Sequence, residues 1–174
     1  MMNTISHSNH QEHKEINWSA IILFALGFWL SGSLLLDFVL IPALSASGMM
    51  AQSGFPSAGF TIFGVFNRIE LICASLVLTC AFVFSFNHDF NSKKQALFVT
   101  FSSLLFLIAL AYTYLFTPHL SAWGLCLNQF NTVTTMPSEM ILWHKGYWIL
   151  EGLKYVFGFN LLRWSYNNLA LLKK

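Results

Sequence analysis

Four long apolar runs constrain the fold of this chain more than any other feature. The runs cover residues 18–41, 60–86, 96–116 and 141–162. Each has about the 20 residues that an α-helix needs to cross a hydrocarbon core of about 30 Å. Strands of a membrane barrel would instead alternate polar and apolar residues over shorter segments. The sequence therefore predicts an all-α, polytopic membrane protein with a four-transmembrane-helix bundle.

The composition supports this class and narrows the domain organisation. Only 9% of the 174 residues are charged and 56% are hydrophobic, whereas soluble domains average about 25% charged residues. We expect one domain over residues 18–164, a polar and disordered tail over 1–17, and a short cytoplasmic tail over 165–174. The sequence has no basic stripe of the kind that binds nucleic acid, so we expect no nucleic-acid partner. We expect the chain to lie in a lipid bilayer. Whether it also binds another membrane protein complex or a second copy of itself is left open.

The distribution of basic residues predicts the orientation. Segments 43–59 and 117–140 contain no Lys or Arg, whereas Lys14, Lys93, Lys94, Arg163, Lys173 and Lys174 all fall on the opposite side of four crossings. The positive-inside rule then places both termini in the cytoplasm, or in the stroma of a plastid. The membrane is an inner, plasma or thylakoid membrane.

A short motif repeats at the same place in two of the runs. Residues 42–48 (PALSASG) and 118–124 (PHLSAWG) share the pattern P-x-L-S-A-x-G, and each follows the outer exit of an apolar run. This equivalence raises a duplicated helical hairpin as a hypothesis, with the two copies related by an axis along the membrane normal.

Ionisable residues interrupt the apolar runs. A charge at the bilayer centre costs about 2.5–3.5 kcal/mol even on insertion scales. We therefore expect these residues to face the bundle interior and to pair. The expected polar network consists of Asp37, Asn67, Arg68, Glu70, Glu151 and Lys154, with His144 beside it.

Spacing suggests which of these charges meet. Arg68 and Glu70 point about 200° apart on a helix, so each needs a partner on another helix. Depth along the helices pairs Arg68 with Asp37, and three-residue spacing pairs Glu151 with Lys154. Three acids against two bases leave one surplus negative charge, so we expect Glu70 or Glu151 to hold a proton.

His144 begins a stripe on the fourth run that continues with Trp148, Glu151 and Tyr155. The spacing of four, three and four residues places them on one helix face. This stripe is either an outward-facing pocket for a ligand, cofactor or proton, or a polar clamp between helices that fixes their packing.

Three stretches resemble a known family: FALGFWLSGSLLLDFVLIPALSASGMM, FGVFNRIELICA and WHKGYWILEGLK. The chain is similar to an uncharacterised four-helix membrane family, known best from cyanobacteria, of the copper-resistance-D-like superfamily. Trp29, Ser31 and Gly32, followed by Asp37 and Pro42, carry this likeness. Some members of that superfamily handle copper, and one is a haem-associated protoporphyrinogen oxidase.

The resemblance implies haem or copper as an alternative, but some relatives carry a histidine early in the first helix and this chain has none there. His144 is the single membrane histidine available as a ligand, so we predict no cofactor.

Two functions follow. The first is a non-enzymatic accessory, assembly or small-solute-handling component with a buried charged network. The second is a haem- or metal-dependent membrane redox enzyme using His144 with Glu70 or Glu151. The chain contains none of the common catalytic motifs, and this absence disfavours an enzyme. The sequence does not exclude one, so the question of enzymatic activity is left open.

Overall fold

A computed structural model describes residues 17–52, 54–87, 92–122 and 138–172 of the chain. In these ranges the protein is all-helical, with four long helices and no strand. The first begins as α1 (Trp18–Leu35) and continues through η1 (Leu36–Leu40) into α2 (Ile41–Ala46). After the short η2 (Met49–Ala51) comes α3 (Phe55–Asn87). Next, α4 (Ser92–Ala111) continues through η3 (Tyr112–Phe116) to residue 122, and α6 is Ser138–Leu172.

Three of these helices are long and apolar enough to cross a membrane: Trp18–Ala46, Phe55–Phe86 and Lys93–Ala122. The all-helical fold confirms the predicted all-α class, and the three apolar helices are consistent with an integral membrane protein. The fourth helix, α6, has 35 residues but carries several charges along its length, namely Glu139, Lys145, Glu151, Lys154 and Arg163.

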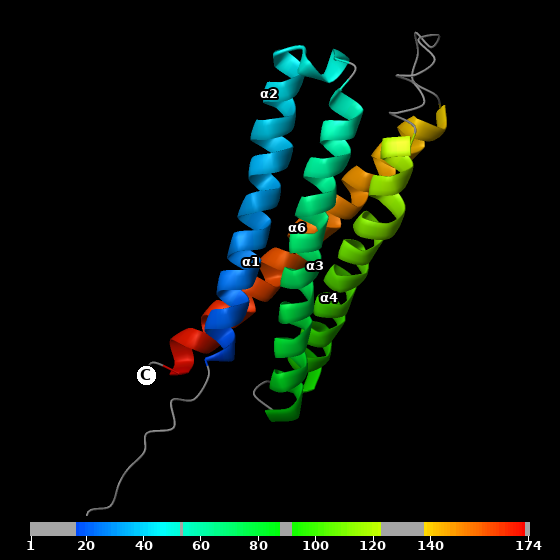
Figure 1. The fold of residues 1–174 in the computed structure, drawn as a ribbon. Helices are drawn as coiled ribbons and strands as arrows, with labels where there is room; N and C mark the ends of the chain where they lie inside the picture. The colour runs from blue at the N-terminus through cyan, green and yellow to red at the C-terminus, as the bar shows by residue number, and fades with distance from the viewer. Residues whose placement is uncertain (1–16, 53, 88–91, 123–137, 173–174) are drawn as a thin grey trace, which may run out of the picture.

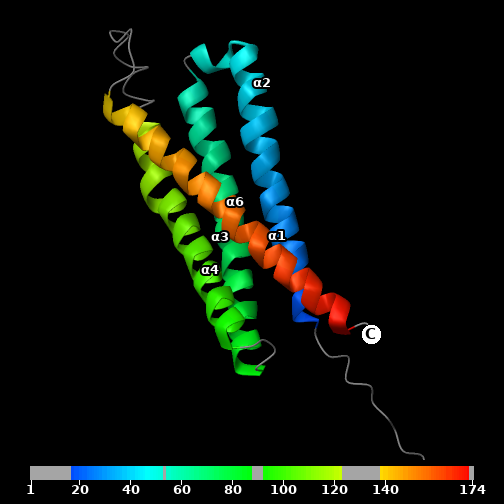
Figure 2. The ribbon, with the colours of Figure 1, turned by 180° about the vertical axis from the view of Figure 1, so that it is seen from behind.

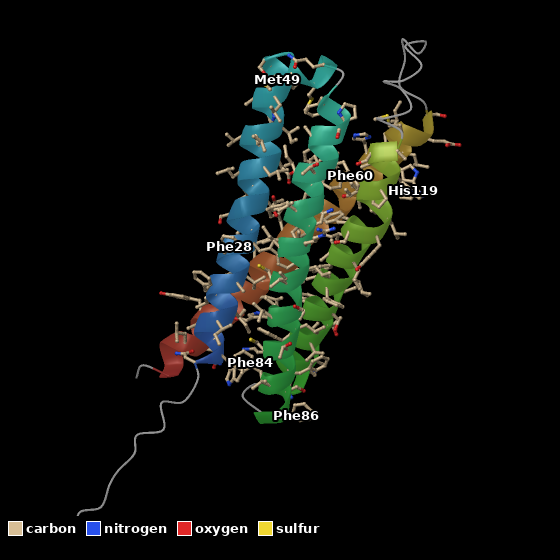
Figure 3. The ribbon with its side chains drawn as sticks, viewed as in Figure 1. Phe28, Met49, Phe60, Phe84, Phe86 and His119 are labelled. Atoms are coloured by element: carbon tan, nitrogen blue, oxygen red, sulfur yellow. The ribbon has the colours of Figure 1, made fainter. Side chains whose placement is uncertain are left out.

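The helices α1, α3 and α4 lie side by side, and α6 crosses one face of this layer obliquely (Figures 1 and 2). α6 packs against α1 and against α4, and it passes over α3, which packs between those two helices. The turn between α2 and α3, marked by Met49, lies at the opposite end from Phe84 and Phe86 (Figure 3). The centre of α6 therefore faces the middle of α3 across the interior.

Two π-helical turns interrupt the first and third helices at equivalent places. The turn Leu36–Leu40 begins six residues before Pro42, and the turn Tyr112–Phe116 begins six residues before Pro118. Proline lacks the backbone N–H of a regular helix, so the preceding turn has to adjust. Asp37 and Tyr112 lie within these turns, and π turns often occur at functional sites.

The interior divides into an apolar half and a polar centre. Toward the end of the molecule marked by Phe84, the core consists mostly of apolar side chains from all four helices, among them Ile22, Leu26, Val77, Phe98, Leu105 and Leu161. Three buried serines, Ser19, Ser102 and Ser165, lie in the same half. Among the described residues, the buried Asp, Glu and Lys side chains lie farther along, where α6 passes over α3. Within the described residues, the apolar half separates this polar centre from the end that carries Phe84 and Phe86.

Gly158 permits the close approach of α6 to α1. A Cβ atom at this position would meet the two methyl carbons of buried Leu30 at 2.8 and 3.0 Å. Gly152, on the same helix, has nothing within 4 Å of the equivalent position. We predict that Gly158→Ala lowers the free energy of unfolding by about 1–3 kcal/mol through overpacking.

The matched control is Gly152→Ala, which we expect to be neutral or slightly stabilising because alanine favours the helix. Thermal unfolding of both variants in the same detergent measures the difference. Equal midpoints for the two variants would show that Leu30 moves aside freely.

Candidate functional site

The polar centre is built around the ammonium group of Lys154 on α6. Its Nζ atom lies 2.7 Å from Glu70 Oε1 on α3 and 2.5 Å from Glu151 Oε1, one turn away on α6. All three side chains are almost fully buried. Lys154 thus joins two carboxylates from two helices that have no close backbone contact within the described residues. The expected contact between Glu151 and Lys154 is present.

α1 closes this site from one side with two further polar groups. Trp29 Nε1 donates a 2.7 Å hydrogen bond to Glu70 Oε1, and Ser33 Oγ donates to the same oxygen at 3.1 Å. Lys154 Nζ in turn donates to Ser33 Oγ at 2.9 Å. Glu70 Oε1 therefore accepts three hydrogen bonds. Buried carboxylates require such partners, because burial removes their contacts with water.

α4 contributes an aromatic wall through Tyr112 in its π turn. The Tyr112 hydroxyl donates a 2.8 Å hydrogen bond to Glu151 Oε2. The Lys154 ammonium lies 5.4 Å from the centroid of the Tyr112 ring and 5.7 Å from that of Tyr155. Cations at this distance from an aromatic face are attracted by its electron density. The ammonium is held by carboxylates and rings together.

Asp37 extends the site toward the end of the bundle that carries Pro42. Its two carboxylate oxygens each lie 3.5 Å from a tyrosine hydroxyl on α6, that of Tyr147 and that of Tyr155. The Asp37 side chain is buried. We refer to the whole set as the central cluster, which comprises Trp29, Ser33, Asp37, Glu70, Tyr112, Tyr147, Glu151, Lys154 and Tyr155.

Arg68 does not belong to the central cluster, so the predicted pair with Asp37 is wrong. The Arg68 side chain is exposed on α3, and among the described residues it has no ion pair or hydrogen bond. The reason is rotation about the helix axis: Arg68 lies about 200° from Glu70, which faces the interior. Asn67 is buried instead, and its Nδ2 donates a 2.6 Å hydrogen bond to Thr117 Oγ1.

The predicted stripe on α6 is also wrong for its first two members, His144 and Trp148. Trp148 is 53% exposed. His144 Nδ1 lies 2.9 Å from the carbonyl oxygen of Met140 on its own helix, and within the described chain His144 makes no hydrogen bond or ring contact with the central cluster. The face that enters the cluster instead carries Tyr147, Glu151 and Lys154, spaced by four and three residues.

Sequence reasoning missed Trp29, Ser33, Tyr112 and Tyr147 as cluster members. For two helices a signal existed. Trp29, Ser33 and Asp37 repeat every four residues, and Tyr147 precedes Glu151 by four, which places each set on one face. Tyr112 has no such signal, because it is the single cluster member on α4.

Comparisons with protein-family models, with curated proteins and with solved structures gave no match. The resemblance to the copper-resistance-D-like superfamily therefore stays a prediction. In the ranges that the structure describes, no three His, Cys, Asp or Glu side chains are grouped so that they could hold a metal ion.

The charge count of the central cluster limits its chemistry. Asp37, Glu70 and Glu151 face one buried ammonium, so two negative charges are in surplus if all three carboxyls are ionised. This is one more than the sequence predicts, since Arg68 lies outside. A buried group without a counter-charge tends to neutralise itself by taking or losing a proton. The cluster is therefore suited to hold a proton or a small cation.

We predict that Lys154→Met lowers the free energy of unfolding by about 3–5 kcal/mol, since removing one partner leaves buried charges uncompensated. Glu70→Gln should cost less, because Lys154 keeps Glu151 as its partner.

The control is Lys145→Met, which removes an exposed lysine from the same helix. Thermal unfolding in lipid nanodiscs at neutral pH compares the variants. If Lys154→Met proves as stable as Lys145→Met, the ammonium is not needed to balance the carboxyls.

Proposed function

We propose that this protein is a non-enzymatic, small-solute-handling component of a membrane, and that its central cluster holds an exchangeable proton. The observation that carries the proposal is the surplus of buried carboxyls, three against the single ammonium of Lys154. Ionisable side chains within apolar helices are costly, and they commonly mark ion or proton pathways.

The position of the cluster supports access from one side. Asp37 and the hydroxyls of Tyr147 and Tyr155 lie on the side of the cluster toward Pro42, where the π turn interrupts the first helix. On the other side the interior is lined by apolar residues such as Leu26, Val77 and Leu161. We infer that a proton enters past Asp37 and reaches Glu151, with the Tyr112 hydroxyl beside it.

The proposal includes four crossings, with α6 as the fourth. The 35 residues of α6 span about 52 Å at 1.5 Å per residue, so an inclined helix still crosses a core of about 30 Å. Its exposed side chains include Leu142, Ile149, Leu153, Val156 and Phe159. Its charges at Glu151 and Lys154 are buried against the other helices.

A duplicated helical hairpin remains part of the proposal. The two π turns precede Pro42 and Pro118 by the same six residues, and each proline begins a copy of the P-x-L-S-A-x-G motif. Equivalent backbone irregularities at equivalent sequence positions support a common origin of the two hairpins.

The alternative function, a haem- or metal-dependent redox enzyme, has less support from the geometry. It requires His144 to act together with Glu70 or Glu151. His144 instead contacts Met140, whereas Glu70 and Glu151 are already bound by Lys154.

A protonated carboxyl gives a characteristic carbonyl band in the infrared spectrum. We predict that purified protein in nanodiscs shows such a band, and that Glu151→Gln or Asp37→Asn removes or shifts it. The physical reason is that one ammonium balances one carboxylate. If Lys154 balances Glu70, the surplus negative charge falls on Asp37 and Glu151, and a proton neutralises it there. The control is Glu139→Gln, which changes an exposed acid at the start of α6.

If substitution of Asp37, Glu70 and Glu151 in turn leaves the band and its pH dependence unchanged, the cluster holds no exchangeable proton. Visible absorption spectra of the same samples distinguish the proposed function from the alternative, a haem-dependent redox enzyme. A haem band that disappears in His144→Ala would favour the redox enzyme.

The proposed orientation places both termini in the cytoplasm and Gln52, just after η2, outside. We predict that Gln52→Cys reacts with a membrane-impermeant maleimide in intact cells, whereas Lys94→Cys reacts only after permeabilisation. The background carries Cys126→Ser, while Cys73 and Cys80 are buried. The reverse pattern of labelling would invert the orientation and the proposed side of proton entry.

A further inference from the structure

The charge of Arg68 has no partner within the part of the chain that the structure describes, although its position lies well inside an apolar helix. Glu70, Cys73, Ala74 and Val77 on α3 are buried and define the face that points inward. Arg68 lies about 200° from Glu70 around the helix, so it points away from the interior. Its side chain is exposed.

Arg68 lies too deep in the span for its guanidinium to reach the lipid headgroups. It lies eight residues from Phe60, the start of the predicted span, or about 12 Å at 1.5 Å per residue. The other end of the span, at Phe86, is farther away. An arginine side chain is shorter than this distance, so its guanidinium would remain in hydrocarbon unless something else supplies a counter-charge.

The side of α3 that carries Arg68 mixes small residues with large apolar ones. Small and hydroxyl-bearing residues on this side are Ser57, Thr61, Gly64, Ser75 and Thr79, and the exposed apolar side chains beside them are Val65, Ile72, Phe82 and Phe86. A Cβ atom at Gly64 would have nothing within 4 Å. The outward face of α1 instead carries Phe24, Phe28 and Leu35, which suit lipid contact (Phe28 is labelled in Figure 3).

Small residues let a second helix approach closely, and polar residues hold helices together in lipid. The hydroxyls of Thr61, Ser75 and Thr79 bond to carbonyls of their own helix, so they do not occupy the space beside α3. This surface, which we call the Arg68 face, is thus open to a neighbouring helix.

A second copy of the chain does not supply the missing charge. Symmetric pairing through this face would set Arg68 against Arg68, and like charges repel. The three acids of the described apolar segments, Asp37, Glu70 and Glu151, are buried in the central cluster. Exposed Glu139 lies at the start of α6, away from the depth of Arg68.

We propose that the Arg68 face binds a membrane-spanning helix of a different protein, and that this helix carries an Asp or Glu at the depth of Arg68. The carboxylate accepts hydrogen bonds from the guanidinium, and the small residues allow the two backbones to approach. An Arg–carboxylate pair is the strongest such contact available, because the guanidinium donates two parallel hydrogen bonds. This inference is independent of the role of the central cluster.

The test uses a photo-reactive benzoylphenylalanine placed at Val65 or at Ile72, which flank Arg68 on the exposed surface of α3. The full chain is expressed in its native membrane and irradiated. We expect an adduct with another protein, in which the cross-linked peptide belongs to an apolar segment of about 20 residues containing Asp or Glu. The same probe at Phe28 on α1 is the control and should give lipid adducts.

The matched variants are Arg68→Leu, which removes the charge, and Arg68→Lys, which retains it. The yield of the protein adduct should fall about tenfold or more in Arg68→Leu and should be partly retained in Arg68→Lys. Because Arg68 makes no hydrogen bond or ion pair within the described chain, Arg68→Leu should insert in equal amount and unfold at an unchanged or higher temperature.

Four results would overturn the proposal. They are adducts with lipid alone at both positions, adducts with a second copy of the chain, a partner without an acid in the cross-linked span, and a yield that Arg68→Leu leaves unchanged. Lipid adducts alone would show that the guanidinium is served by phosphate groups of the bilayer.

Discussion

The structure depends on one buried cation. Lys154 brings its ammonium between Glu70 and Glu151 and beside Ser33, so that α6 is tied electrostatically to α3 across the interior. The backbones of these two helices are not in close contact within the described residues. α6 crosses the layer of α1, α3 and α4 obliquely, and the long lysine side chain spans the gap that this crossing leaves. Trp29 and Tyr112 then complete the site from the two flanking helices.

The two ionisable residues of the FNRIE stretch illustrate two solutions to the cost of charge in lipid. Glu70 is turned inward and receives donors from α1 and α6. Arg68 is turned outward, and no acceptor from the described chain binds its guanidinium. The same turn of α3 therefore serves both an internal network and an external surface.

Much of the fold could be predicted from the sequence, because helix length and apolarity follow directly from bilayer thickness. The predicted runs 18–41, 60–86 and 96–116 lie within the three apolar helices. The Glu151–Lys154 contact could also be predicted, since it depends only on spacing along one helix. The meeting of Lys154 with Glu70 could not, because it requires the crossing of α6 over α3. The outward position of Arg68 could not be predicted from its depth and its 200° separation from Glu70 alone, because both sides of α3 are apolar in sequence. It follows from the orientation of α3, which turns Glu70, Cys73 and Ala74 inward.

The order of the helices in the chain has a consequence for biogenesis. Chains emerge from the ribosome amino-terminus first, so α1, α3 and α4 are made before α6. Among the described residues, these three are the helices that are long and apolar enough to cross a membrane. When Lys154 emerges, Glu70, Ser33 and Tyr112 have already been synthesised on those earlier helices. The groups that contact the Lys154 ammonium on the earlier helices are thus synthesised before the lysine itself.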